Sequence, residues 1–177
     1  MIKPVRRIVT GHDENGRSIF VADDIATSVY SPKGQPNVGM TDLWLQHSAP
    51  ADNTGNDDTA PNSVTLLPPT RGSVCRVVEF PPDSERNFAA MQDHFSGMGA
   101  GDNLAKDKPR HAAFHKTDSL DYIFILEGEI WALVDESEVL MRPGDCLIQR
   151  GTSHAWSNRS DKPCLMAAIL IDADPAP

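Results

Sequence analysis

The sequence predicts an all-β protein with one short helix, and two observations support this prediction. Strand-like apolar runs recur at intervals of about ten residues through the last third of the chain, separated by turn sequences such as Arg142-Pro143-Gly144-Asp145. The 177 residues also include 14 Pro and 12 Gly, which favour many short elements joined by turns. Such a pattern is typical of an antiparallel sandwich or barrel. The predicted strands of this region are Tyr122–Leu126, Glu129–Asp135, Ser137–Met141, Cys146–Gln149, Ala155–Asn158 and Cys164–Ile171.

Residues 1–69 are predicted to form an arm of strands and loops. Apolar runs on either side of Asn15-Gly16 indicate a hairpin, because Asn-Gly readily adopts the positive φ angles of a tight turn. A short strand is predicted over residues 41–46, and the polar, proline-containing residues 48–63 are predicted to be a loop. We expect this arm to pack against a barrel formed by residues 70–174 or to reach a second subunit.

One helix is predicted over residues 86–97, after a strand at residues 73–80 that ends at Pro81-Pro82. Apolar side chains recur there at helical spacing, at Phe88, Met91, Phe95 and Met98. A stripe of this kind most often packs into a core or covers a site. His94, within the same segment, is expected at the surface.

Charge and cysteine content exclude several classes of function. Sixteen Lys and Arg against 25 Asp and Glu give a net charge of −9, which argues against nucleic acid as the main partner. No run approaches the roughly 20 apolar residues that cross a bilayer, so we expect no membrane partner. No secretory signal is visible, and three widely separated cysteines form no CxxC pair, which together predict a cytoplasmic protein. Cys146 is expected to be a small core residue.

Two clusters of ligand-type side chains flank the predicted strands, one over residues 111–121 and one over residues 151–158. His115, Thr117 and Asp121 share the same parity, so on extended backbone they face the same side. A straight strand would place His115 and Asp121 about 20 Å apart, and only a tight turn at Asp118-Ser119 would bring them opposite each other.

These clusters resemble the two motifs of the cupin superfamily of small β-barrels, over roughly residues 111–171. His115-x-Thr117, three residues, Asp121, six residues and Gly128 reproduce the spacing of the first motif. Pro143-Gly144, followed by Gly151-x-x-His154-x-x-x-Asn158, reproduces the second. Thr117 and Asp121 stand where many cupins have a second histidine and a glutamate. The resemblance implies a double-stranded β-helix, or jelly roll, and is closest to a little-studied bacterial subgroup with similar proteins in fungal secondary metabolism.

Coordination chemistry suggests a metal site at the resembling positions. His115, His154 and Asp121 would form a two-histidine, one-carboxylate set, which leaves positions for a substrate or for oxygen. The same donors suit Fe, Mn, Ni or Zn, so they do not select one divalent ion. Thr117, Gln149 and Arg150 are predicted to line the substrate pocket, and the last two to orient an acidic group of the substrate.

The sequence leaves three functions open. The first is a metal-dependent oxygenase, decarboxylase or isomerase acting on a small organic acid or aromatic metabolite. The second is a non-catalytic barrel that binds a small molecule. The third is a metal-free epimerase or dehydratase with His115 or His154 as general base and Asp121 as its partner. Open sheet edges favour a homodimer in each case.

Overall fold

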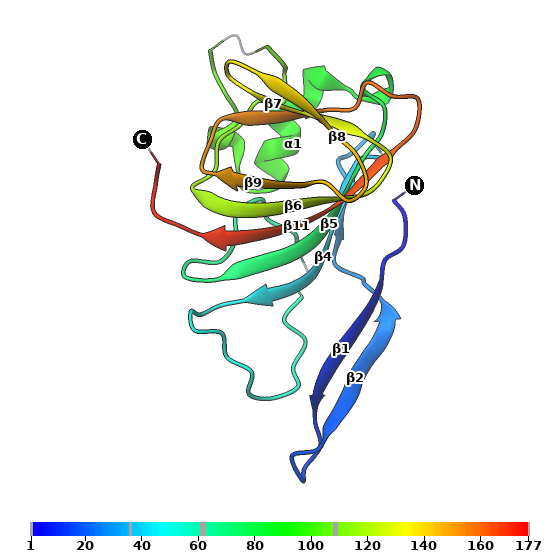
Figure 1. Cartoon of the computed structure of the whole chain (residues 1–177), viewed down its shortest axis with the longest axis vertical. Coiled ribbons are helices and arrows are strands. Elements are labelled where there is room, and N and C mark those ends of the chain that lie inside the picture. Colours follow the sequence, from blue (N-terminus) through cyan, green and yellow to red (C-terminus); the bar gives the residue numbers. More distant parts are fainter. Residues whose placement is uncertain (1, 36, 61–62, 108–109, 177) are drawn as a thin grey trace.

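The computed structural model describes residues 2–35, 37–60, 63–107 and 110–176 (Figure 1). Its strands are β1 (Arg6–His12), β2 (Ser18–Ile25), β3 (Val29–Tyr30), β4 (Gly39–Gln46), β5 (Ser73–Phe80), β6 (Ser119–Glu127), β7 (Ile130–Val134), β8 (Glu138–Met141), β9 (Cys146–Arg150), β10 (His154–Ser157) and β11 (Cys164–Asp172). The helix α1 spans Met91–Gly97, and short 3-10 turns span Asp83–Glu85, Phe88–Ala90 and Gly101–Asn103. The predicted all-β class with one short helix is confirmed.

Two antiparallel sheets enclose the core. One contains six strands in the order β3-β4-β5-β11-β6-β9, and the other contains β10-β7-β8. Along β11, burial alternates residue by residue, so that Cys164, Met166, Ala168 and Leu170 face inward. These side chains pack with inward-facing residues of β6, β7 and β10, including Ile123, Ile130 and Trp156. The arrangement is a jelly-roll barrel with its core between the two sheets.

The helix begins later than predicted. Arg86 has extended backbone angles, φ −92° and ψ 138°, and α1 starts only at Met91 after a 3-10 turn. The side chain of Arg86 hydrogen-bonds to Asp83 and to the carbonyl oxygen of Trp156, which fixes this segment against β10. The predicted apolar face is confirmed, because Met91, Phe95 and Met98 pack in a second apolar cluster with Met40, and Phe88 packs against this cluster.

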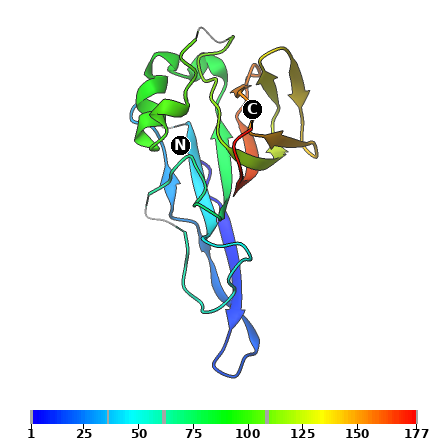
Figure 2. The ribbon, with the colours of Figure 1, turned by 90° about the vertical axis from the view of Figure 1, so that its left-hand side faces the viewer.

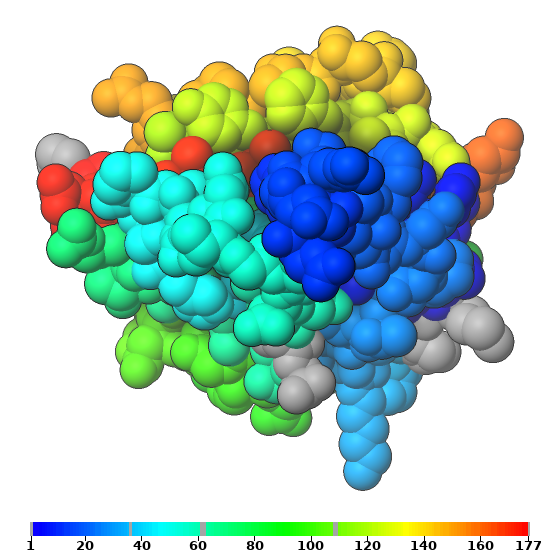
Figure 3. Space-filling model, turned by 90° about the horizontal axis from the view of Figure 1, so that it is seen from below, coloured from blue at the N-terminus to red at the C-terminus, as the bar shows by residue number. Residues whose placement is uncertain are grey.

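The N-terminal hairpin is a separate two-stranded sheet. β1 pairs with β2 around the predicted turn, where Gly16 has a φ of 74°. Figures 1 and 2 both show this hairpin projecting away from the barrel. Figure 3 shows it side by side with the loop that follows β4, and Arg7 bridges to Asp58 of that loop over 2.7 Å. β3 and β4, also N-terminal to residue 70, instead join the main sheet beside β5.

No helix among the described residues is long and apolar enough to span a membrane.

Candidate functional site

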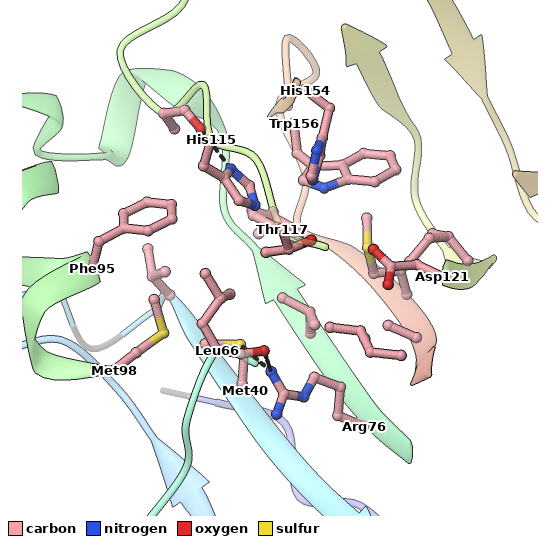
Figure 4. A pocket seen from close by; sticks show the side chains of 18 of the residues that line it. Met40, Leu66, Arg76, Phe95, Met98, His115, Thr117, Asp121, His154 and Trp156 are labelled. Atoms are coloured by element: carbon pink, nitrogen blue, oxygen red, sulfur yellow. Dashed lines mark hydrogen bonds between the residues drawn. The ribbon is translucent and has the colours of Figure 1, made fainter. Parts of the chain in front are cut away.

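A cavity of about 100 Å³ lies inside the barrel, between the main sheet and α1 (Figure 4). Phe95 and Met98 close one side, and the ring of Phe95 lies 4.9 Å from the ring of His115. Most lining side chains are apolar, and the polar or charged ones are Arg76, Arg86, His94, His115, Thr117, Asp121, Gln149 and His154. Such a pocket, apolar with a few convergent polar groups, is typical of a small-molecule site.

Two histidines meet at this pocket through a short backbone pairing. The amide nitrogen of His115 donates to the carbonyl oxygen of His154 over 2.9 Å, and the reverse bond has the same length. Their rings lie 4.1 Å apart between centroids. The predicted second-motif histidine therefore lies directly beside the first, although 39 positions separate them along the chain.

Backbone contacts determine the tautomer of both rings. Nδ1 of His115 lies 2.9 Å from the carbonyl oxygen of Ala113, and Nδ1 of His154 lies 2.9 Å from that of Thr152. A carbonyl only accepts, so each Nδ1 carries the hydrogen and each Nε2 keeps a lone pair. Burial lowers the pKa of His115 to about 4 and lowers the pKa of His154 well below its ordinary value, so both imidazoles are neutral near pH 7.

Asp121 occupies the inward face of β6, opposite Gln149 of β9. The amide nitrogen of Gln149 donates to Oδ2 of Asp121 over 2.9 Å and to Nε2 of His154 over 3.0 Å. Oδ1 of Asp121 is buried without a hydrogen-bond partner. Burial raises the pKa of this carboxyl, while hydrogen bonds from Ser119 and Gln149 act in the opposite direction.

Of the two remaining predicted pocket residues, Thr117 lines the pocket and Arg150 does not. Thr117 is buried in the pocket wall, where its hydroxyl lies 2.9 Å from the hydroxyl of Ser119. Arg150 is exposed and does not line this pocket, because neighbouring residues of β9 face opposite sides and Gln149 faces inward. No tight turn forms at Asp118-Ser119. Instead, His115 lies before β6 in the bridge to His154, and Asp121 lies within β6.

The predicted ligands suit a metal in chemistry more than in position. Two neutral imidazoles that keep their Nε2 lone pairs, that of His154 accepting from Gln149, and one unpartnered, buried carboxylate oxygen are the right donors for a divalent ion. Within the described parts of the chain, however, no three His, Cys, Asp or Glu side chains come close enough together to hold one. The side-chain amide of Gln149 lies between two of these donors, within hydrogen-bond distance of both Asp121 and His154.

Three polar pocket residues were not predicted from the sequence. His94, expected at the surface, lines the pocket, one turn from Met91 and Met98 in the apolar stripe. Arg76 lies at the base of the pocket in a buried ion pair with Asp42, with Nε 3.0 Å from Oδ1 (Figure 4). Arg86 lines it from the segment before α1. Helical spacing would have placed His94 near the apolar face, whereas no local pattern marks either arginine.

Comparison with known protein families supports the resemblance to cupins that the two motifs indicate. The sequence model of the cupin domain family matches residues 104–171, which contain β6 to β10 and nearly all of β11. The resemblance to the cupin superfamily is confirmed over these residues. The match includes His115, Thr117, Asp121 and His154, all of which line the pocket.

Two fungal proteins resemble this chain along almost its whole length. The cupin-domain-containing oxidoreductase fogC of Aspergillus ruber is 29% identical over 96% of this chain and 73% of its own. Phomopsin biosynthesis cluster protein C' of Diaporthe leptostromiformis is 28% identical over 98% of this chain and 82% of its own. The solved Cupin 2 conserved barrel domain protein of Salinispora arenicola has a TM-score of 0.42 and 13% identity, over 78% of this chain and 80% of that chain.

Proposed function

We propose that this protein is an oxidoreductase-type enzyme that acts on a small organic acid or aromatic metabolite bound inside the barrel. The observation that supports this most is the position of His115, Asp121 and His154, which three separate segments bring to one buried, mainly apolar pocket. The names of the fungal relatives, an oxidoreductase and a biosynthetic cluster protein, favour oxidation of a metabolite as the type of reaction.

The proposal includes a divalent metal ion, Fe, Mn, Ni or Zn, held by His115, His154 and Asp121. When bound, such an ion would supply Lewis-acid or redox chemistry to a substrate beside it. The chain itself keeps both imidazoles neutral by burial and directs their Nε2 lone pairs away from their backbone partners. To let the carboxylate and His154 reach one ion, the amide of Gln149 would turn away from them.

The walls of the pocket would position the substrate and exclude water. Phe95, Met98 and Trp156 surround the histidines with apolar surface, so a ligand in the cavity would replace solvent around the reacting groups. Thr117 would contribute a hydroxyl beside them.

A metal-free reaction is a second candidate, and one specific observation favours it. Gln149 already hydrogen-bonds to Oδ2 of Asp121 and to Nε2 of His154, which leaves the lone pair on Nε2 of His115 as a proton acceptor in an apolar site. In this case His115 would act as general base on an acidic C–H or O–H of the ligand.

The test is the metal content of protein purified without chelator or affinity tag, and again after anaerobic reconstitution. Near-stoichiometric metal in the wild type that is lost in His154→Ala would support the metal-dependent enzyme. The exposed His12 serves as a matched control, because His12→Ala leaves the pocket untouched. Wild-type protein without metal in both preparations would overturn the metal-dependent form and direct work to the acid–base reaction.

A further inference from the structure

Arg86 lines the pocket, and its guanidinium includes a buried donor without a partner. Its side chain is only 3% exposed. Nη1 donates to Oδ1 of Asp83 over 3.1 Å and to the carbonyl oxygen of Trp156 over 3.0 Å. Nε is buried and has no hydrogen-bond partner. Buried N–H groups are rarely left unpaired in folded proteins, so an acceptor supplied by a ligand would complete this arginine.

Neighbouring groups hold Arg86 in place. Its guanidinium carbon lies 4.7 Å from the ring centroid of Phe88 and 5.4 Å from that of Phe80. Asp83 balances the charge of Arg86. It also accepts hydrogen bonds from the hydroxyl of Ser157 over 2.6 Å and from the backbone nitrogen of Asn158 over 3.2 Å. Because these partners are already in place, little further ordering of Arg86 is needed when a ligand binds.

A second unpartnered group lies nearby on α1. Nδ1 of His94 is buried without a hydrogen-bond partner, and this side chain lines the same cavity. Burial and the positive charge of Arg86 lower the pKa of His94 to about 4, so the ring is neutral near pH 7 and can donate or accept.

We propose that Arg86 binds the carboxylate of a small monocarboxylic acid, whose apolar body lies in the cavity between Arg86 and the two histidines. A guanidinium matches a carboxylate in both charge and planar geometry. The inference rests on the proposed function, because it names the substrate class of the same pocket.

The other arginines do not fit this role. Arg76 lines the cavity, but its Nη atoms already donate to Asp42 and to the carbonyl oxygens of Thr65 and Leu66. Arg150, predicted for an acidic substrate group, is exposed on the opposite face of β9. Nε of Arg76 also lacks a hydrogen bond, but it lies 3.0 Å from Oδ1 of its countercharge Asp42. In Arg86 it is Nη1, not Nε, that lies against the carboxylate of Asp83, so the unpaired Nε of Arg86 is the better candidate donor.

Binding of benzoate and of its neutral isostere benzamide tests this proposal. Affinities would be measured by isothermal titration calorimetry for the wild type, Arg86→Gln, Arg86→Lys and His154→Ala, with Arg110→Gln as a control at an exposed arginine. Circular dichroism and urea unfolding would verify that each variant is folded. Arg86→Lys keeps the charge beside Asp83, so it remains informative if Arg86→Gln does not fold.

We expect the wild type and His154→Ala to bind benzoate about tenfold or more tightly than benzamide, as a charged hydrogen bond would produce. Arg86→Gln should lose this preference while its affinity for benzamide stays within about twofold. Arg86→Lys should keep part of it, and Arg110→Gln all of it.

Equal affinities in the wild type, or absence of binding of both probes, would overturn the role of Arg86. A preference that survives in Arg86→Gln but disappears in His154→Ala would also overturn it, because the carboxylate would then bind at the histidines. None of these results alters the metal content and its loss in His154→Ala, which test the proposed function separately.

Discussion

Gln149 donates a hydrogen bond from its side-chain nitrogen to Nε2 of His154, over 3.0 Å. The same nitrogen lies 2.9 Å from Oδ2 of Asp121, so one amide group supplies both residues with a partner. An NH₂ group between a carboxylate and an imidazole lone pair makes contacts that a cation would also make. Gln149 is therefore the side chain with which a metal ion would compete for Asp121 and His154.

Replacing Gln149 with Ala should strengthen metal binding. An ion would no longer have to displace two hydrogen bonds, one of them to a charged group, so we expect about a tenfold gain in affinity or more. Titration with Zn²⁺ or Co²⁺ against a competing chelator measures this, with Arg150→Ala as the matched control on the outer face of β9. Weaker binding in Gln149→Ala would contradict the prediction and would make the amide oxygen a ligand.

Breaking the buried pair of Arg76 and Asp42 should strongly destabilise the fold. Asp42→Asn leaves a buried guanidinium without its countercharge, at an expected cost of about 3–5 kcal/mol in the free energy of unfolding. Urea denaturation is the measurement. The double variant Arg76→Met/Asp42→Leu removes both charges and should recover most of the loss. If Asp42→Asn is as stable as the wild type, the hydrogen bonds to backbone carbonyls are enough to stabilise the buried charge of Arg76, which would contradict the prediction.

Stability should fall as the pH drops from about 6.5 towards 4, and His94 should contribute to this fall. Its pKa is about 4 in the folded chain, against an ordinary value of 6.5, so the unfolded state binds more protons in this window. One such group contributes a slope of up to about 1.4 kcal/mol per pH unit. Urea unfolding at pH 7 and pH 5 should show a smaller difference for His94→Gln than for the wild type. If the difference is unchanged, the pKa of His94 in the folded chain is close to its ordinary value.

The three cysteines should react at very different rates. Cys146 is exposed on β9, contrary to the expectation of a core position, because it has the outward parity of this strand. Cys164 is buried, and burial raises its pKa to about 12. A thiol reagent such as dithionitrobenzoate should modify one thiol rapidly in native protein, and Cys146→Ser should abolish this phase. Rapid reaction of a second thiol in Cys146→Ser would contradict this ranking.

The N-terminal hairpin should mediate a homodimer. An isolated two-stranded sheet is marginally stable, and Phe20 on β2 is 72% exposed, with Ile8 and Ile25 also exposed. We expect light scattering to give the mass of a dimer, and Phe20→Asp to shift it to a monomer with unchanged circular dichroism. Glu14→Lys, at the hairpin turn, is the control for charge. A monomeric wild type at micromolar concentration would contradict the prediction.

Much of the barrel could be predicted because local patterns determine it. Turn residues and alternating apolar positions located the strands of the last third of the chain, and the Asn15-Gly16 turn located the hairpin. The start of α1 could not be predicted in this way. Helical spacing extends back to Phe88, but the buried side chain of Arg86 holds the preceding backbone in an extended conformation.

The sequence predicted several residues that line the pocket, but not the contacts between them. Motif spacing identified His115, Asp121 and His154, but the direct pairing of the two histidine backbones joins residues distant in the sequence. Parity along β9 separates Gln149 from Arg150, yet which of them faces inward depends on its pairing with β6. Arg86 is held at the pocket by Asp83, three residues before it, and by the carbonyl oxygen of Trp156 in β10, a contact that no local pattern indicates.

Three of the side chains that line the cavity are the buried methionines Met40, Met98 and Met166. Oxidants convert a thioether into a sulfoxide, which is polar and needs hydrogen-bond partners that an apolar wall does not offer. If oxidation chemistry takes place in this cavity, these methionines are the first oxidisable side chains that an escaping oxidant would contact. Inactivation would then begin with the methionines inside the barrel, and its extent would depend on the number of reaction cycles rather than on the time elapsed.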